Sequence, residues 1–139
     1  PMSMKNEDLE KFLSETHVAV ISTVDADNHP HSAPIWYAWE DGAAYLFTGR
    51  RTLKWRNIQQ NPHVSLCIDW REVPYRSAII EGIAEEVERP LYDLALSMST
   101  RYYGEGKGRA FSEGYRENSD GVVIFRITPE SIASFESDE

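Results

Sequence analysis

A chain of 139 residues, 41% of them hydrophobic and 12% aromatic, has the length and composition of one globular domain with a substantial core. It carries 14 Lys and Arg against 23 Asp and Glu, which gives a net charge of -9. Nucleic acids and anionic membranes bind broad basic surfaces, so this balance argues against both as partners.

Cysteine use and the length of the apolar segments indicate the compartment. Cys67 is the single cysteine, so no internal disulfide can form, and we interpret it as a small buried apolar residue rather than a nucleophile. No apolar run reaches the roughly 18 residues of a membrane-spanning helix, and the first residues, PMSMK, lack the hydrophobic segment of a signal peptide. We therefore expect a soluble, cytoplasmic protein in which residues 1–139 form one domain.

The N-terminal part of the chain predicts a helix and a hairpin. Asn6 followed by acidic residues is typical of a helix start, and the apolar spacing predicts an amphipathic helix over about 6–15. The β-rich segments 17–24 and 31–40 are separated by turn residues, which predicts a hairpin. Pro34 cannot donate a ladder hydrogen bond, so the second strand is expected to be irregular, at a sheet edge, or beside a bound ligand.

The middle of the chain predicts two more strands with a helix between them. The pair Asp41-Gly42 is favoured in tight hairpin turns, and a third strand over 43–48 follows it. A short helix is expected over about 52–60, ended by Asn61-Pro62. The fourth strand is predicted over 63–70.

The next segments predict a long strand, a helix and a loop. Residues 76–88 read as a strand, with Gly82 at a bulge or a close backbone approach. Apolar residues at helical spacing predict a helix around 91–98. Residues 105–119 are rich in glycine and charge, so we predict a mobile loop with one helical turn around 110–115.

The end of the chain predicts a last strand over 121–127, a final turn from Thr128 and an acidic tail over about 129–139. The count is then six strands joined mainly by hairpins, with a few short helices. This pattern predicts a mainly β, antiparallel barrel, because closing the sheet removes most exposed strand edges.

Four of the 14 cations fall within seven consecutive positions, at the predicted junction of a strand and a helix: Arg50, Arg51, Lys54 and Arg56. Such a junction presents free backbone N–H groups and the positive end of a helix dipole, which together bind phosphate. The hydroxyls of Thr48 and Thr52 add hydrogen-bond donors. The alternative is a basic helix that faces solvent and balances nearby carboxylates.

The neighbouring aromatic strand favours the phosphate site. Beside Pro34, one hairpin away from the basic cluster, lie residues that could form a flat apolar slot: Ile35, Trp36, Tyr37 and Trp39. A phosphate anchor next to such a slot indicates a phosphorylated planar cofactor.

Three stretches of the chain resemble the pyridoxamine 5'-phosphate oxidase-like superfamily of flavin and deazaflavin proteins: HPHSAPIWYAWEDGAAYLFT, GRRTLKWRNIQQNPHVSLCID and YRSAIIEGIAEEVE. The pattern T-x-x-x-[ST]-x-K-x-x-N-x-x-x-N-P-x-V-S carries most of the resemblance, which covers roughly residues 6–128. It implies a six-stranded Greek-key split β-barrel, a homodimer, and a cofactor bound between the two subunits.

The resemblance also assigns residues to a cofactor site. Thr48, Thr52 and Lys54 match the phosphate-holding positions, with Arg50 and Arg51 as further candidates. By the same resemblance the backbone of Pro34, Ile35 and Trp36 lines the isoalloxazine ring, and Arg76 and Ser77 contribute from across the ring.

One departure bears on the activity. Pyridoxamine phosphate oxidases proper place Arg-Lys after the hydroxyl residue, whereas this chain has Leu53-Lys54, and their C-terminal Trp and Arg-x-His substrate elements are missing. Oxidation of a B6 vitamer is therefore not what we expect.

The resemblance implies an oxidoreductase that binds FMN, with the deazaflavin F420 as the alternative cofactor and a non-catalytic flavin-binding module as the alternative of another class. A small organic molecule is expected as substrate and a nicotinamide as a possible electron donor.

We expect no metal, because His29 and His31 flank a turn with no third ligand near in sequence. Catalytic residues stay open, since Tyr37, Tyr75 and Tyr102 could donate protons or only pack. A loop within 101–119 could close over a substrate or lie apart from the site.

Overall fold

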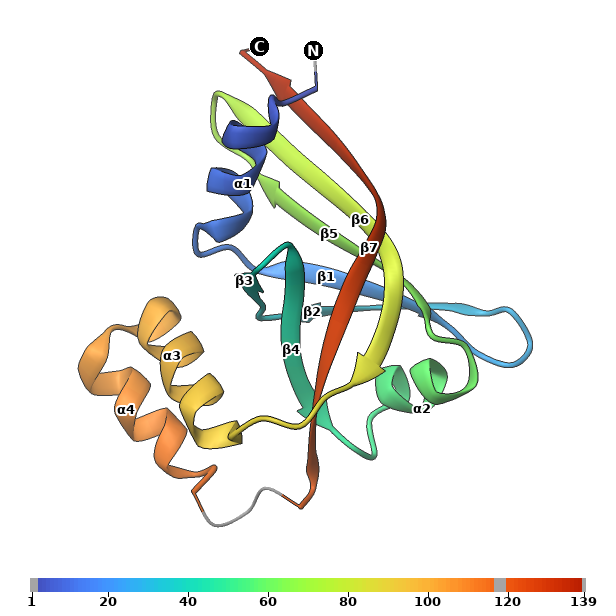
Figure 1. The fold of residues 1–139 in the computed structure, drawn as a ribbon, viewed down its shortest axis with the longest axis vertical. Helices are drawn as coiled ribbons and strands as arrows, with labels where there is room; N and C mark the ends of the chain where they lie inside the picture. The colour runs from blue at the N-terminus through green and yellow to red at the C-terminus, as the bar shows by residue number, and fades with distance from the viewer. Residues whose placement is uncertain (1–2, 117–119, 139) are drawn as a thin grey trace.

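The computed structural model describes residues 3–116 and 120–138. Within these residues the chain forms a mainly β fold with four helices (Figure 1). The elements in chain order are α1 Asn6–Ser14, β1 Ala19–Val24, β2 Pro30–Ile35, β3 Ala38–Glu40, β4 Ala43–Gly49, α2 Leu53–Gln60, β5 His63–Trp70, β6 Tyr75–Glu86, α3 Leu91–Tyr103, α4 Glu105–Glu113 and β7 Val122–Ser137. None of the helices in this described part is long and apolar enough to cross a bilayer.

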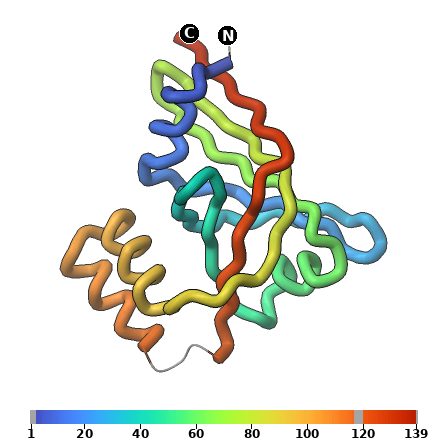
Figure 2. Tube along the Cα trace, viewed as in Figure 1, coloured from blue at the N-terminus to red at the C-terminus, as the bar shows by residue number. Residues whose placement is uncertain are grey.

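The strands form one antiparallel sheet in the order β2-β1-β5-β6-β7-β4-β3. Three local hairpins, β1–β2, β3–β4 and β5–β6, are joined by the distant pairings β1–β5, β6–β7 and β4–β7. The sheet curls into a half-open barrel, and the long strands β6 and β7 run through its middle (Figure 2). The predicted split barrel is confirmed, with seven strands instead of six.

Alternation along the strands separates an inner core from an outer layer. Leu66 and Ile80 are fully buried inside the curled sheet, and α1 adds Phe12 and Leu13 to the same core. In β4 the residue Leu46 belongs to this inner core, whereas its neighbours Tyr45 and Phe47 pack toward α3 on the other face.

The predicted strand over 31–40 is two strands. β2 pairs with β1 as far as Ile35, and the chain then bends and pairs again as β3 with β4. Tyr37 lies in this bend, fully buried, and its hydroxyl donates a 2.8 Å hydrogen bond to the carbonyl of Leu13 at the end of α1. The inward alternation continues through the bend, since Ile35, Tyr37 and Trp39 all belong to the inner core. The prediction of an edge strand at Pro34 is confirmed, since β2 ends the sheet.

The end of the chain is a strand where we predicted a turn and an acidic tail. β7 runs to Ser137 and pairs with β6 along its length, from Glu86 opposite Phe125 to Tyr75 opposite Ser137. The register shifts at Gly82, as predicted for a bulge, and a Cβ atom there would lie 2.2 Å from the carbonyl oxygen of Thr128. Pairing with a long partner strand therefore outweighs the local turn and charge signals.

The predicted loop over 105–119 is also wrong for most of its length. Residues 105–113 form α4, which packs against α3 as a helical hairpin, and residues 117–119 lie outside the described part. Gly108 makes this packing possible, because a Cβ atom there would lie 2.6 Å from the backbone of Thr100. The Ser99 hydroxyl adds a 2.8 Å hydrogen bond to the Gly108 carbonyl. Gly108 thus serves helix contact rather than loop motion.

Two smaller expectations also change. The helix α1 begins at Asn6, but the residue in the N-cap position is Lys5 and no side chain caps the helix. Cys67 is half-buried rather than buried, and burial raises the pKa of its thiol, which agrees with a role other than nucleophile.

Candidate cofactor site

Hydroxyl groups and an ammonium group converge where β4 gives way to α2. Thr52 is the N-cap of α2: its hydroxyl donates to the carbonyl of Gly49 at 2.9 Å and accepts from the backbone N–H of Trp55 at 3.4 Å. The Thr48 hydroxyl lies 3.3 Å from that of Thr52, and the ammonium of Lys54 donates to Thr48 at 3.3 Å. We call Thr48, Thr52 and Lys54 the β4–α2 cradle.

Lys54 is a half-buried cation without a counter-charge in residues 3–116 and 120–138. Its only hydrogen-bond partner there is the neutral Thr48 hydroxyl. Burial lowers the pKa of Lys54 from its ordinary value of 10.5, and no nearby carboxylate offsets that effect. Such a cation at a helix N-terminus attracts an anion, because an anion restores the charge interaction that burial removes.

The two arginines of the predicted site lie outside the cradle. Arg50 forms an exposed ion pair with Glu86 of β6 at 2.7 Å. Arg51 is exposed on the turn before α2 and makes no ion pair within the described ranges. The structure therefore brings Thr48, Thr52 and Lys54 together and leaves Arg50 and Arg51 at the rim.

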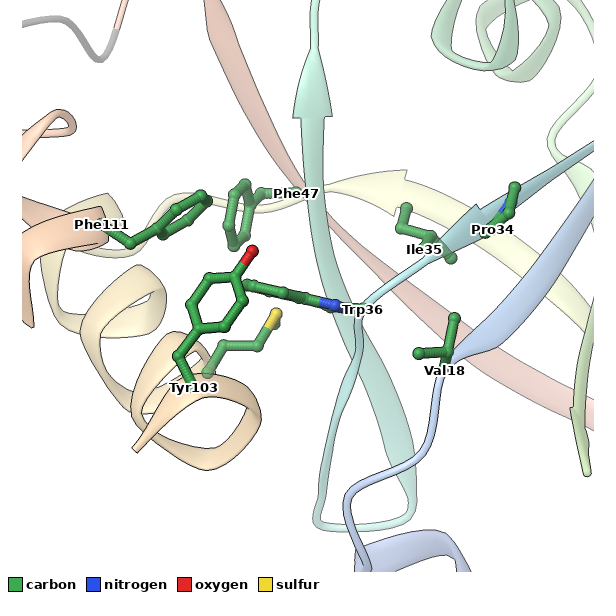
Figure 3. Close-up of a pocket in the computed structure, with 8 residues that line it drawn as sticks. Val18, Pro34, Ile35, Trp36, Phe47, Tyr103 and Phe111 are labelled. Carbon is green, nitrogen blue, oxygen red and sulfur yellow. The ribbon is translucent and has the colours of Figure 1, made fainter. Parts of the chain in front are cut away.

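A pocket of about 290 Å³ lies where β2 ends, between the sheet and the α3–α4 hairpin (Figure 3). We call it the hairpin pocket. Its lining is apolar apart from one hydroxyl and one indole N–H, and consists of Val18, Pro34, Ile35, Trp36, Phe47, Met98, Tyr103 and Phe111. The sequence-predicted residues Pro34, Ile35 and Trp36 thus share one site.

The predicted aromatic slot is only partly correct. Ile35 and Trp36 reach the hairpin pocket, but Tyr37 and Trp39 point into the core, where the Trp39 indole donates to Glu10 at 2.7 Å. Sequence reasoning missed the pocket residues Met98 and Tyr103 of α3 and Phe111 of α4, and Phe111 was hidden because α4 was read as a loop. Phe47 could have been found from the sequence, because neighbouring residues of a strand face opposite sides of the sheet and Phe47 precedes Thr48.

The pocket and the cradle therefore lie at the same end of β4 on opposite sides of the strand. Phe47 faces α3, and the next residue, Thr48, is buried next to Lys54. On one edge β4 pairs with β7 throughout, but on the other it pairs with β3 only over residues 43–45. Within the described part of the chain, residues 46–48 thus present an unpaired strand edge between the two sites, and free N–H and C=O groups of this kind bind the polar rim of a ring.

Arg76 and Ser77 are not part of this assembly. They lie at the start of β6, whose other end, Glu86, contacts Arg50. Ten residues of strand separate Arg76 from Glu86, which is about 33 Å. Arg76 pairs with Glu15 at 3.2 Å and lies over the Phe12 ring. Within one chain these residues cannot reach the cradle.

The tyrosines and histidines considered from sequence have other partners. The Tyr37 hydroxyl donates to the Leu13 carbonyl, and burial raises the pKa of Tyr37. Burial likewise raises the pKa of Tyr102. Tyr102 donates to the carbonyl of His17. His29 contacts Asp25 at 3.1 Å in an exposed turn, in line with the surface interpretation.

A curled antiparallel sheet with an anion-attracting strand–helix junction defines a split β-barrel protein. A family model described as pyridoxamine 5'-phosphate oxidase matches residues 6–135. The chain therefore belongs to the pyridoxamine 5'-phosphate oxidase family.

Curated relatives carry the same family name. The chain is 30% identical over 92 residues to a pyridoxine/pyridoxamine 5'-phosphate oxidase of Anaplasma phagocytophilum, a match that covers 66% of this chain and 44% of the relative. It is 32% identical over 77 residues to the enzyme of the same name from Acidothermus cellulolyticus, covering 55% of this chain and 34% of that one. This chain thus spans less than half the length of these relatives.

Solved structures of similar fold extend over nearly the whole chain. A conserved hypothetical protein, Rv2991 from Mycobacterium tuberculosis, has a TM-score of 0.80 at 25% identity, covering 96% of this chain and 85% of its own. A protein titled F420 reductase has a TM-score of 0.70 at 23% identity, covering 88% of this chain and 94% of its own. These structures agree with the split-barrel fold described above.

Proposed function

We propose that this protein is a flavin-dependent oxidoreductase that binds FMN and acts on a small organic substrate. The observation that carries the proposal is Lys54: a half-buried cation at a helix N-terminus, hydrogen-bonded only to a hydroxyl and free of ion pairs within the described residues. A phosphate group fits this donor set, since the ammonium, the Thr48 hydroxyl and the first backbone N–H groups of α2 can donate to it.

The isoalloxazine ring belongs, in this proposal, along the free edge of β4 beside Pro34, Ile35 and Trp36. Bound FMN supplies hydride transfer at its central ring, so the protein needs no side-chain nucleophile. The chain's own contribution is to hold the phosphate at Lys54, to orient the ring by backbone hydrogen bonds at the strand edges, and to exclude water with the apolar residues of the hairpin pocket.

A second copy of the chain completes the site in this proposal. Five residues on the outer face of the sheet are neighbours in register across five strands and form what we call the outer apolar stripe: Pro34, Val20, Cys67, Ile79 and Ala133. Val20 and Ile79 are well exposed, which is unusual for apolar side chains in adjacent strands. The stripe starts at Pro34 of the ring site, so a partner packed on it would carry its own Arg76 and Ser77 toward that site.

F420 is the second candidate cofactor, and the F420 reductase of similar fold supports it. Its acidic tail would need cations beyond the cradle. Arg50 is engaged with Glu86, which leaves Arg51 and Arg56 as exposed cations of this segment and favours the shorter FMN.

An open pocket beside the ring favours an enzyme over a non-catalytic flavin-binding module, because a substrate must reach the ring. We place the enzyme in the cytoplasm, with a nicotinamide as electron donor.

Titration of the purified protein with FMN and with F420, followed by their visible spectra, tests the assignment. The proposal predicts tight binding of FMN and bleaching of its absorbance band on addition of a nicotinamide donor. Tight F420 binding without FMN binding would support the second candidate. FMN binding without reduction by any donor or substrate would support the binding module, and binding of neither cofactor would contradict the proposal.

A further inference from the structure

The hairpin pocket lies next to the proposed ring position, and its chemistry restricts what can enter it. Four of its eight lining residues are aromatic: Trp36, Phe47, Tyr103 and Phe111. Among the residues that the structure describes, no carboxylate, ammonium or guanidinium group lines it. A charged ligand would lose its hydration there without gaining a counter-charge. The free energy lost by desolvating the charge exceeds the free energy gained from contact with apolar side chains.

The polar side-chain groups of the lining are few and defined. The Tyr103 hydroxyl and the Trp36 indole N–H are the side-chain nitrogen and oxygen groups among the eight residues. In Figure 3 the Tyr103 hydroxyl points toward Trp36 and Phe47 rather than away from them. The lining therefore offers one or two hydrogen bonds to a molecule that is otherwise apolar.

Two residues of α3 that do not line the pocket, Arg101 and Tyr102, fix the position of its walls. Tyr102 stacks on the Trp36 indole with ring centroids 4.5 Å apart and planes 4° apart, and its hydroxyl donates to the His17 carbonyl. Arg101, the preceding residue of α3, donates to the carbonyls of Ser14 and Glu15 at 2.8 and 3.2 Å. These bonds fix the end of α3 to the end of α1 and to the start of β1, so the indole face is pre-organised for a flat ligand.

We propose that the hairpin pocket binds the substrate, and that the substrate is an uncharged, planar aromatic compound with at most one or two hydrogen-bonding groups. This inference rests on the proposed function, because it takes the cofactor ring to lie on the strand edges beside Pro34 and Trp36. The anion-binding β4–α2 cradle lies on the other side of β4, so the cofactor phosphate and the substrate occupy chemically separate sites.

A matched pair of fluorescent probes tests the charge selectivity of the pocket. N-phenylnaphthylamine is neutral and built of flat aromatic rings, and anilinonaphthalenesulfonate carries the same rings with a sulfonate. We expect the neutral probe to bind the FMN-loaded protein at least about tenfold more tightly than the sulfonate. Equal affinity for the two probes, or no binding of the neutral probe, would overturn the proposal.

Variants locate the probe. Phe111→Ala removes one wall of the pocket and is expected to weaken N-phenylnaphthylamine binding about tenfold, with Phe111→Leu as a milder second variant should the first not fold. Tyr92→Ala, on the same hairpin but outside the pocket lining, serves as the control and should leave probe binding unchanged.

The affinity for FMN separates this inference from the proposed function. Phe111→Ala should leave FMN affinity within about twofold of the parent protein, because the phosphate is held on the other side of β4. An equal loss of FMN and probe affinity would assign the pocket to the cofactor ring and overturn the substrate proposal. If the parent protein fails to bind FMN, the same two probes are titrated into the protein without FMN, and intact selectivity there would count against the cofactor alone.

Discussion

Lys54 carries a positive charge in a place that is unfavourable for it in the free protein. The spacing Thr48, Thr52, Lys54 made this cluster predictable, because a strand end, a turn and a first helical turn bring residues four and six apart together through local geometry alone. The pairing of Arg50 with Glu86 was not predictable, since it depends on the distant contact of β6 with the end of β4. Local signals thus predicted the cluster of Thr48, Thr52 and Lys54 correctly, but they wrongly added Arg50 to it.

The pH dependence of FMN binding follows from the lowered pKa of Lys54. A bound phosphate raises that pKa, so binding takes up a proton when the pH lies between the pKa values of the free and bound states. Affinity should therefore be highest below the free-state pKa and fall as the pH rises through it, at a pH below the ordinary 10.5 of lysine. Isothermal titration at increasing pH checks this decline.

Lys54→Met keeps the apolar stem and removes the charge, so the decline with pH should disappear in this variant. Arg56→Met, which removes an exposed cation of the same helix, is the control and should keep it. An unchanged pH profile in Lys54→Met would exclude Lys54 as the titrating group.

At the scale of elements, the strands of the N-terminal half were predicted well and the C-terminal segments poorly. Turn residues marked the hairpins of β1 and β4 because those signals are local. The helix α4 was hidden by its glycines, of which Gly108 serves its contact with α3, and the second half of β7 was hidden by an acidic composition that only pairing with β6 overrides. Tertiary contacts decide such segments, and a single sequence does not display them.

A pair of glycines in α4 tests the close helix contact. Gly108→Ala would place a methyl group 2.6 Å from the Thr100 backbone, whereas nothing lies within 4 Å of a Cβ atom at Gly106. We expect Gly108→Ala to lower the free energy of unfolding by about 1–3 kcal/mol through overpacking. Gly106→Ala should raise it by up to about 1 kcal/mol through helix propensity. Urea denaturation measures both, and a stabilising Gly108→Ala would mean that the two helices do not pack closely.

For the whole molecule, the split barrel was predictable from the count of strands and from the resemblance, but the surface that we propose completes the site was not. The outer apolar stripe becomes visible only when the register of five strands is known, since its members are scattered from Val20 to Ala133 in the chain. The separation of Arg76 from the cradle likewise follows from the length of β6. Both observations support a site shared between two copies.

Two exposed alanines provide a matched test of the dimer. Ala133→Glu places a charge in the outer apolar stripe, and Ala110→Glu places the same charge on α4, away from it. We expect the first variant to shift the protein from dimer to monomer in sedimentation velocity and to weaken FMN binding at least about tenfold, because a buried unpaired charge is costly. The second should change neither, and a dimer that survives Ala133→Glu would move the interface to another face.

The affinity ratio of FMN to riboflavin tests the central claim most directly, because the two ligands differ only by the phosphate. Docking of that phosphate on Thr48, Thr52 and Lys54 predicts that FMN binds at least about tenfold more tightly than riboflavin, the scale of one charge-assisted hydrogen bond. Lys54→Met should reduce the ratio toward one while riboflavin affinity stays constant. Equal affinities of the parent protein for FMN and riboflavin would contradict a phosphate site at the junction of β4 and α2.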